Sequence, residues 1–142
     1  MLLSITRLDQ SLPLPRYETA GACAFDVYAR VETVVGSRSL GLIPTNLVVC
    51  VPGGHVLLLC SRSSTPRKKG LLIPHGVGII DQDYCGGADE LMAQVYNFTD
   101  QPVTVARGER VAQALVVPMA RCEIVEAGPG REDNRGGFGT TG

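Results

Sequence analysis

The sequence predicts an all-β protein, a jelly-roll-like antiparallel barrel or sandwich formed by a single domain. Three observations support this class. The 142 residues include 17 glycines and 9 prolines, so turns are frequent. The apolar segments between the turns are short and rich in Val, Ile and Leu, as strands are. No segment keeps a helical period of apolar residues over three turns. The length suffices for one hydrophobic core.

The expected strands follow one another at the short, regular spacing that is typical of sandwiches and jelly rolls. Strong turn signals separate some of them, at Pro52-Gly53-Gly54 and Asp100-Gln101-Pro102. In chain order the strands are expected over residues 2–6, 24–30, 39–43, 46–51, 55–61, 71–74, 77–80, 91–98, 102–106, 111–118 and 122–126.

The stretch from Gly76 to Gly87 organises the chain. Its apolar residues predict a short buried strand, and the paired glycines Gly86-Gly87 predict a tight hairpin after it. Asp81, Asp83 and Tyr84 would then sit at the strand edge, open to a ligand, where one carboxylate is a candidate general base. An Asx-type turn that merely closes the hairpin is the alternative.

Three further polar clusters lie at strands or in loops. Asp26 stands inside an apolar strand, where a charge is costly unless it is paired or linked to a metal. Arg62 lies among hydroxyls in Ser61-Arg62-Ser63-Ser64-Thr65, and these groups suit phosphate oxygens. Gln113 follows the turn at 107–110. A buried turn acid, a surface ion pair and a polar residue at a sheet edge are the respective alternatives.

The last polar segment is the glycine-rich stretch 128–142, which is expected to form an arm beside a domain over residues 1–127. Either it is a frayed terminus, or it orders on a ligand or a neighbouring subunit. Glycines let backbone N–H groups approach phosphate, and Phe138 can stack on a base.

In this order the five clusters resemble the five motifs of the trimeric dUTP pyrophosphatase (dUTPase) family. The resemblance runs from about Leu14 to Gly142 and is most specific in Ile80-Asp81-Gln82-Asp83-Tyr84 and Gly137-Phe138-Gly139-Thr140-Thr141-Gly142. It implies a jelly-roll homotrimer that hydrolyses dUTP to dUMP and pyrophosphate with Mg²⁺, in active sites shared between subunits. In this family the reaction keeps uracil out of DNA and supplies dUMP for thymidylate synthesis.

The resemblance also implies roles for single residues. Asp81 is similar to the acid that activates the attacking water and contacts the sugar 3′-hydroxyl, and Tyr84 to the aromatic that leaves no room for a 2′-hydroxyl. Asp26 would hold Mg²⁺ through metal-bound water, the metal being held mainly by the triphosphate. Ser63 would join Asp81 and Asp26 in catalysis. The residues expected at the substrate are also Arg62, Ser63, Ser64, His75, Gly78, Gln113, Arg135, Phe138, Gly139 and Thr140, with Phe138 over the uracil.

The chain departs from the family pattern at three places. Asp133 occupies the position of the usual tail arginine, so Arg135 is expected at the γ-phosphate in preference to Arg131. The segment 85–91 is a few residues longer than the common form. His75 stands where an asparagine is frequent, so a solvated loop histidine is the alternative to a uracil contact.

Two other functions share this scaffold. A dCTP deaminase needs a glutamate three residues before Asn97, where this chain has Gln94, and an amide cannot shuttle protons. A non-catalytic nucleotide-binding or partner-binding module would be expected to lack Asp81, Asp26 or the tail, yet all are present.

The net charge and the cysteines limit which binding partners and which cellular compartment are expected. A net charge of −1 gives no field that attracts nucleic acid or an anionic membrane, so neither is expected as a partner. The five scattered cysteines fit neither a disulfide framework nor a zinc site, and Cys50 and Cys60 are expected in the core. With no signal peptide or membrane-spanning run in the sequence, a cytoplasmic location is expected.

Overall fold

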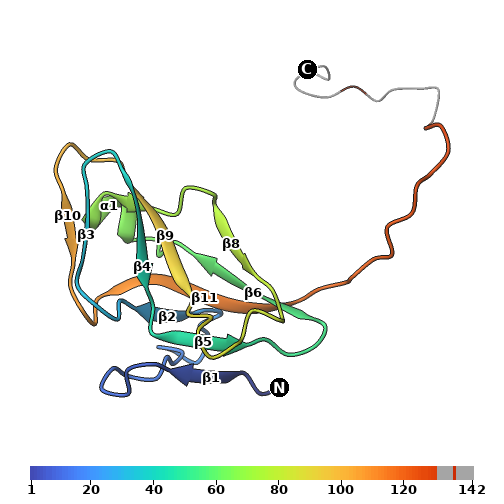
Figure 1. The fold of residues 1–142 in the computed structure, drawn as a ribbon, viewed down its shortest axis with the longest axis horizontal. Helices are drawn as coiled ribbons and strands as arrows, with labels where there is room; N and C mark the ends of the chain where they lie inside the picture. Colours follow the sequence, from blue (N-terminus) through green and yellow to red (C-terminus); the bar gives the residue numbers. More distant parts are fainter. Residues whose placement is uncertain (131–135, 137–142) are drawn as a thin grey trace.

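The computed structural model describes residues 1–130 and 136, and this part of the chain is almost entirely β (Figure 1). The single helix among these residues is α1 (Thr65–Lys69). The strands are β1 (Ser4–Arg7), β2 (Phe25–Tyr28), β3 (Thr33–Val35), β4 (Leu40–Pro44), β5 (Leu47–Cys50), β6 (His55–Cys60), β7 (Leu71–Leu72), β8 (Val77–Ile80), β9 (Met92–Asn97), β10 (Val103–Val105) and β11 (Arg110–Pro118).

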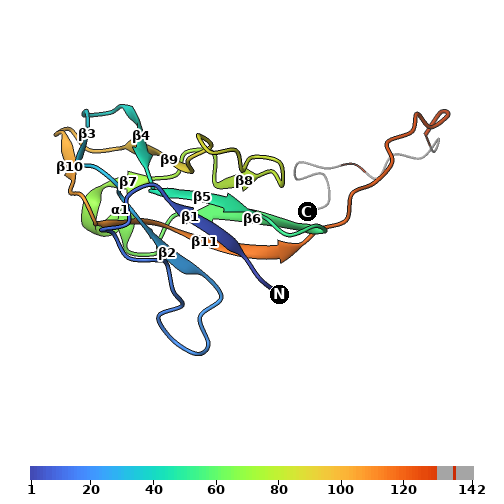
Figure 2. The same cartoon turned by 60° about the horizontal axis from the view of Figure 1, so that its bottom comes forward.

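The strands form two larger sheets and two strand pairs, and every pairing is antiparallel. The four-stranded sheet has the order β2-β11-β6-β8, and the three-stranded sheet has the order β4-β9-β7. In Figure 2 the strands β2, β11 and β6 lie below β4 and β9. β1 pairs with β5, and β3 pairs with β10. The predicted all-β, jelly-roll-like fold is confirmed as a layered sandwich, since no sheet within residues 1–130 closes into a barrel.

The core lies between these layers and is formed by alternate residues of the strands. Val27 and Leu57 face it from the four-stranded sheet, and Ile43, Leu71 and Val95 face it from the other sheet; each is at most 2% exposed. Because successive residues of a strand point to opposite faces, their neighbours in sequence face outward. This alternation places the polar residues of β2 and β11 on the surface of the four-stranded sheet.

The helix α1 was not predicted, and its shortness explains why. It spans five residues, carries a proline in its first turn and ends at Gly70, whose φ of 68° is in the left-handed region. A side chain at Gly70 would also clash with the methyl group of Thr99. Proline at the start and glycine at the end are helix boundary signals, but five residues are too few to show a helical period.

The predicted strand over residues 122–126 is wrong. Residues 122–126 form no strand within the described chain, since residues 119–130 run away from the sheets (Figure 1) and leave Ile124 97% exposed. An apolar run indicates a strand only where a partner strand is within reach.

Among the described residues, the structure contains no apolar helix of the length that a membrane span requires. The prediction of a core position for Cys50 is also wrong, because this last residue of β5 is exposed.

The predicted hairpin at Gly86-Gly87 is also absent. β8 pairs with β6, whereas the next strand, β9, pairs with β4 and β7. The segment 81–91 therefore crosses from the four-stranded sheet to the three-stranded sheet. Neither glycine has a positive φ, and the backbone N–H of Gly86 instead donates to the carboxylate of Asp89 over 2.7 Å. A glycine pair marks a turn, but the partner strand decides whether that turn closes a hairpin.

Candidate functional site

The first cluster of predicted site residues lies on the outer face of the four-stranded sheet. Asp26 on β2 stands opposite Gln113 on β11, and Gln113 also stands opposite Cys60 at the end of β6. The neighbours of Asp26 in sequence, Phe25 and Val27, are buried in the core, so Asp26 points the other way. The sheet register thus brings the acid, the glutamine and the loop after β6 together.

Two arginines bind the Asp26 carboxylate. Arg62 Nε donates to Asp26 Oδ1 over 2.7 Å, and Arg110 donates to Asp26 Oδ2 over 3.1 Å. Of the two possibilities expected for this strand acid, a paired charge and a link to a metal, the structure shows the pairing, with the Asp26 side chain only 12% exposed. Arg110 also lies 3.8 Å from Glu18 Oε1, so a second carboxylate faces this arginine pair. A guanidinium group has five N–H donors, and those that Asp26 does not use can bind phosphate oxygens.

The loop that carries Arg62 is held at its start. Gln113 Nε2 donates to the carbonyl of Ser61 over 3.0 Å, and the backbone N–H of Ile73 donates to Ser61 Oγ over 2.9 Å. Ser63 is exposed, and Ser64 makes no capping hydrogen bond to α1 although it directly precedes the helix. The two serines lie beside the arginine pair on an anchored loop, with hydroxyls that can bind a ligand.

The second cluster is Asp81 and Tyr84, in the segment that follows β8. The backbone N–H of Tyr84 donates to the carbonyl of Asp81 over 3.3 Å, which forms a turn. The Tyr84 hydroxyl donates to the carbonyl of Glu90 over 3.1 Å, and Tyr84 is 40% exposed. Asp81 is exposed. An open pocket of about 260 Å³ lies here, lined by Ile79, Ile80, Asp81, Tyr84, Leu91 and Met92.

Gly78 and His75 lie at the β8 strand. Gly78 is buried opposite Leu59, and an added Cβ would come within 3.3 Å of Leu59 Cβ and 3.5 Å of His75 Nε2. A side chain here would crowd the β6–β8 pair, which gives a packing reason for glycine. His75 is exposed and has room for a ligand contact.

The two clusters lie at opposite ends of the β6–β8 ladder. Cys60 pairs with Val77 at the end where the Arg62 loop begins, and Leu57 pairs with Ile80 at the end where Asp81 begins. These ends are three residue steps apart, roughly 10 Å along the strand. One subunit therefore groups Asp26, Arg62 and Gln113, and separately groups Asp81 and Tyr84. The other predicted site residues, Arg135, Phe138, Gly139 and Thr140, lie outside the described residues, as does Arg131.

The structure adds Arg110 and Glu90 to the residues predicted from sequence. Arg110 opens β11 three residues before Gln113 and completes the arginine pair on Asp26. Glu90 is 9% exposed and binds Arg30, a residue 60 positions away. An acid directly before an apolar strand was the only sequence signal for Glu90.

Residues 1–130 contain no group of three or more His, Cys, Asp or Glu side chains that could hold a metal ion. A metal bound by protein alone is therefore not supported in this part of the chain. The Asp26 oxygens each accept one hydrogen bond from an arginine and keep lone pairs for another donor. This donor set fits a Mg²⁺ ion that keeps its waters and is carried by a substrate.

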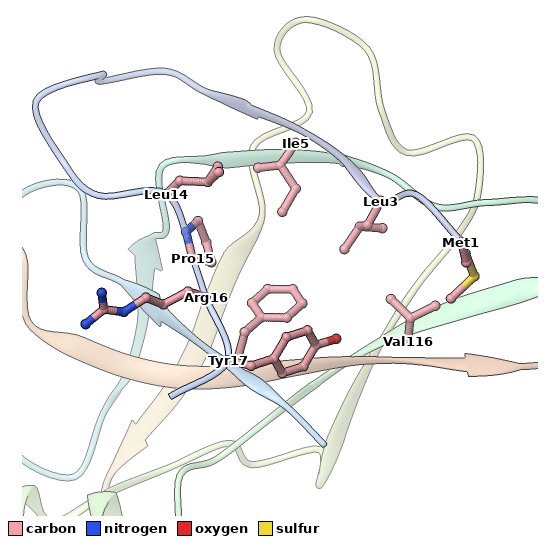
Figure 3. Close-up of a pocket in the computed structure, with 9 residues that line it drawn as sticks. Met1, Leu3, Ile5, Leu14, Pro15, Arg16, Tyr17 and Val116 are labelled. Atoms are coloured by element: carbon pink, nitrogen blue, oxygen red, sulfur yellow. The ribbon is translucent and has the colours of Figure 1, made fainter. Parts of the chain in front are cut away.

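A larger pocket, of about 440 Å³, lies elsewhere, between the N-terminal residues and β2 (Figure 3). Its walls include Leu3, Ile5 and Phe25, and Tyr17 packs edge to face on Phe25 with ring centroids 6.0 Å apart. The one charged lining residue, Arg16, extends its guanidinium away from the other sticks in Figure 3. This pocket has no acid for proton transfer, so the chemistry is assigned to the two polar clusters.

Comparisons with known proteins agree with this arrangement. A family model described as dUTPase matches residues 10–142. The deoxyuridine 5′-triphosphate nucleotidohydrolase of Dictyoglomus turgidum is 38% identical, with 97% of this chain and 96% of that protein covered. The crystal structure of dUTPase from Streptococcus mutans has a TM-score of 0.77 and 34% identity, with 84% of this chain and 98% of that chain covered.

A mutant dUTPase from phage phi11 of S. aureus has a TM-score of 0.78 at 21% identity, covers 89% of this chain and 97% of its own, and so shows the common fold alone. The match of the family model over nearly the whole sequence, together with a relative of 38% identity, settles the affiliation. The chain belongs to the dUTPase family of enzymes.

Proposed function

We propose that this enzyme hydrolyses dUTP to dUMP and pyrophosphate in composite sites, with Asp81 activating the water that attacks the α-phosphorus. The observation that supports composite sites is the separation of the two polar clusters, which lie at opposite ends of the β6–β8 ladder. A nucleotide needs base, sugar and phosphate contacts together. A homotrimer meets this need if Asp81 and Tyr84 of one subunit face Asp26 and Arg62 of the next.

The phosphate end of the site is formed by the arginine cluster. A triphosphate carries about four negative charges, and a protein of near-zero net charge must neutralise them locally. Arg62 and Arg110 supply two positive charges beside the carboxylates of Asp26 and Glu18, and their guanidinium groups keep N–H donors for the phosphates. Arg62, Ser63, Ser64 and Gln113 bind the phosphate oxygens, with Ser63 close to the reacting group. Arg135 of the C-terminal arm adds a contact to the γ-phosphate.

Mg²⁺ enters with the triphosphate. When bound, the metal withdraws charge from the phosphate oxygens and the leaving pyrophosphate. Asp26 is the residue that would hold the metal, through a metal-bound water, by the lone pairs that the arginines leave free.

The nucleoside end lies in the pocket at Asp81 and Tyr84. The exposed Asp81 carboxylate accepts a proton from water in line with the bond to the leaving pyrophosphate and contacts the 3′-hydroxyl. The Tyr84 ring packs on the deoxyribose and leaves no room for a 2′-hydroxyl. Gly78 and His75 line the base side, and the backbone of this region matches the hydrogen-bonding edge of uracil.

The C-terminal arm 128–142 closes the site. Phe138 covers the uracil, while Gly139 and Thr140 offer backbone donors to the phosphates. The enzyme acts in the cytoplasm. The five free cysteines of the described chain support a reducing compartment.

The test is release of pyrophosphate from dUTP, dCTP, dTTP and UTP, each with and without Mg²⁺. We expect strong preference for dUTP over dCTP and UTP, a smaller preference over dTTP, and loss of most activity when the metal is chelated. Thymine differs from uracil only by a methyl group, so only a close steric contact can exclude it. The long segment 85–91 is expected to approach the base less closely, which gives a smaller preference over dTTP. Release of ammonia from dCTP would contradict the proposal and indicate a deaminase.

A further inference from the structure

We infer that Glu90 is a positioning residue that holds Tyr84 in place and thereby sets the discrimination between deoxyribonucleotides and ribonucleotides. The inference rests on the proposed contact of Tyr84 with the sugar. It concerns a residue that lies outside the motifs of the site and reaches the substrate only through Tyr84.

Tyr84 depends on a single polar link for its orientation. It lies in the irregular segment between β8 and β9 and is 40% exposed, so burial does not fix the ring. In the described chain, its side chain makes one hydrogen bond, from the hydroxyl to the carbonyl of Glu90 over 3.1 Å. The position of the ring therefore follows the position of the Glu90 backbone.

Glu90 in turn is held by its carboxylate. Arg30 Nε donates to Glu90 Oε1 and an Arg30 terminal nitrogen donates to Oε2, each over 2.8 Å. The backbone N–H of Asn46 donates to Glu90 Oε1 over 2.7 Å. Paired donors on a planar carboxylate fix direction as well as distance. The Glu90 side chain is only 11% exposed, so it is largely shielded from water that would compete for these bonds.

The groups that hold Glu90 are fixed to the core. Asn46 occupies the β4–β5 turn with a φ of 72°, and its side chain exchanges hydrogen bonds of 2.6 and 2.9 Å with the backbone of Asp9. The next residue after Glu90, Leu91, is fully buried, and its backbone N–H donates to the carbonyl of Leu47 over 2.8 Å. Glu90 thus links the exposed ring of Tyr84 to the rigid β4–β5 turn.

The middle of the segment offers weaker support. Gly86 is bound by Asp89 within the segment itself, which ties these residues to each other and not to the core. Cys85 reaches the end of β5, where a hydrogen bond with the Cys50 side chain raises the pKa of the Cys85 thiol. A neutral thiol is a weak donor and acceptor. The start of the segment is anchored separately, since Gln82 Nε2 donates to the carbonyl of His55 over 2.8 Å. The charged, bidentate link at Glu90 is the constraint at the other end, next to the group that Tyr84 contacts.

Loss of the link should affect one substrate feature selectively. A side-chain displacement of about 1 Å at a reacting or excluding group changes rates by up to about 10²-fold. If Tyr84 shifts, the space for a 2′-hydroxyl opens, whereas the phosphate contacts at Asp26 and Arg62 are unchanged. The ratio of kcat/KM for UTP to that for dUTP then reports the position of Tyr84, because both nucleotides carry the same triphosphate.

The experiment compares Glu90→Gln with Glu109→Gln. Glu109 is a matched control because it also pairs with a cation, Lys69 at 2.8 Å, and accepts a backbone N–H, that of Ala106 at 3.1 Å. We expect Glu90→Gln to raise the UTP/dUTP ratio about tenfold or more, and Glu109→Gln to leave it unchanged. Equal ratios in the two variants, at comparable thermal stability, would overturn the inference.

A second variant keeps the test independent of folding. Tyr84→Phe removes the hydroxyl link from an exposed position and should raise the same ratio. Because both changes break one chain of contacts, the double variant should show less than the product of the two effects. Multiplicative effects would contradict the inference. Activity of the wild-type protein on dUTP tests the proposed function separately.

Hydrogen exchange gives a readout that needs no turnover. Amides of residues 82–89 should exchange faster in Glu90→Gln than in Glu109→Gln, without nucleotide. The amide keeps one acceptor oxygen but cannot form the charged, bidentate pair with Arg30, so the link is weakened. Unchanged exchange in this segment would also overturn the inference. If the wild-type protein fails to hydrolyse dUTP, the exchange result still decides whether Glu90 orders the segment.

Discussion

Arg62 Nε donates a hydrogen bond to Asp26 Oδ1 over 2.7 Å and so ties the loop after β6 to β2. The pair joins residues 36 positions apart in the chain. Arg110 donates to the other carboxylate oxygen, so Asp26 holds both arginines of the proposed phosphate site. The same carboxylate is the proposed contact to metal-bound water. One side chain therefore serves both the fold and the chemistry.

Asp26→Asn should reduce kcat/KM for dUTP and raise the Mg²⁺ concentration needed for half-maximal rate. The amide keeps one acceptor oxygen but turns an N–H₂ toward the other arginine, and a partly buried guanidinium without a partner costs about 1–3 kcal/mol of stability. Rates across a Mg²⁺ titration and urea unfolding measure both effects. Asp100→Asn, which removes an exposed pair with Arg38, is the control and should change neither. A normal Mg²⁺ dependence in Asp26→Asn would contradict the metal role.

Asp81→Asn should leave the protein folded and able to bind nucleotide while turnover falls by roughly two to four orders of magnitude, because the amide cannot take a proton from water. The side chain is exposed, so stability should be unaffected. Single-turnover kinetics and equilibrium binding of a non-hydrolysable analogue separate chemistry from binding. Asp83→Asn, also exposed, is the matched control. Near-normal turnover in Asp81→Asn together with loss in Asp83→Asn would transfer the role to Asp83.

Mixed oligomers test the composite site. Asp81→Asn and Arg62→Ala should each be nearly inactive alone. When the two chains are unfolded together and refolded as a mixture, about one quarter of sites should combine an intact Asp81 with an intact Arg62 from a neighbour. Activity regained in verified mixed trimers would support sites shared between subunits. Activity that stays at the level of the separate variants would mean that each subunit builds its own site.

The C-terminal arm is tested by truncation before Arg131. We expect the shortened chain to fold and to assemble as the full chain does, since the core lies within residues 25–114, while kcat falls strongly for want of closure over the nucleotide. Sedimentation and unfolding curves control for assembly. Within the arm, Arg135→Ala should impair activity more than Arg131→Ala, and the reverse order would correct the assignment of the γ-phosphate contact.

Asp9 should make stability depend on pH in the acid range. Hydrogen bonds from the Ser11 side chain, and then from Arg107, hold the pKa of this carboxyl well below its usual value near 3.8. A lowered pKa in the folded state means that the charged form stabilises the fold above the unfolded pKa. This contribution is lost as the pH falls below about 4. The difference in free energy of unfolding between wild type and Asp9→Asn should therefore shrink from pH 6 toward pH 2. A constant difference would show that the carboxylate charge is not involved.

Much of the fold was predictable because it depends on local pattern. Short apolar runs between glycine and proline turns predict the all-β class, and most strands lie where alternation places them, among them β2, β6, β9 and β11. The acid inside β2 predicted a charge partner or a metal, since an isolated charge there is costly, and the structure shows the charge partners. The family resemblance depends only on residue types and their order in the sequence, as at Asp26, Arg62, Asp81 and Tyr84. It needs no information about where these residues lie in space.

Only the tertiary structure decided which strands pair and where the site residues meet. The apolar run at 77–80 indicates a strand, but its pairing with β6 and not with β9 turned the expected hairpin into a crossing segment. The same pairing separates Asp81 from Arg62 within one chain, and the long-range bond to Arg30 buries Glu90. The physical reason is that side-chain alternation is a local property of a strand. Register, crossing and ion pairing depend on contacts between residues far apart in sequence.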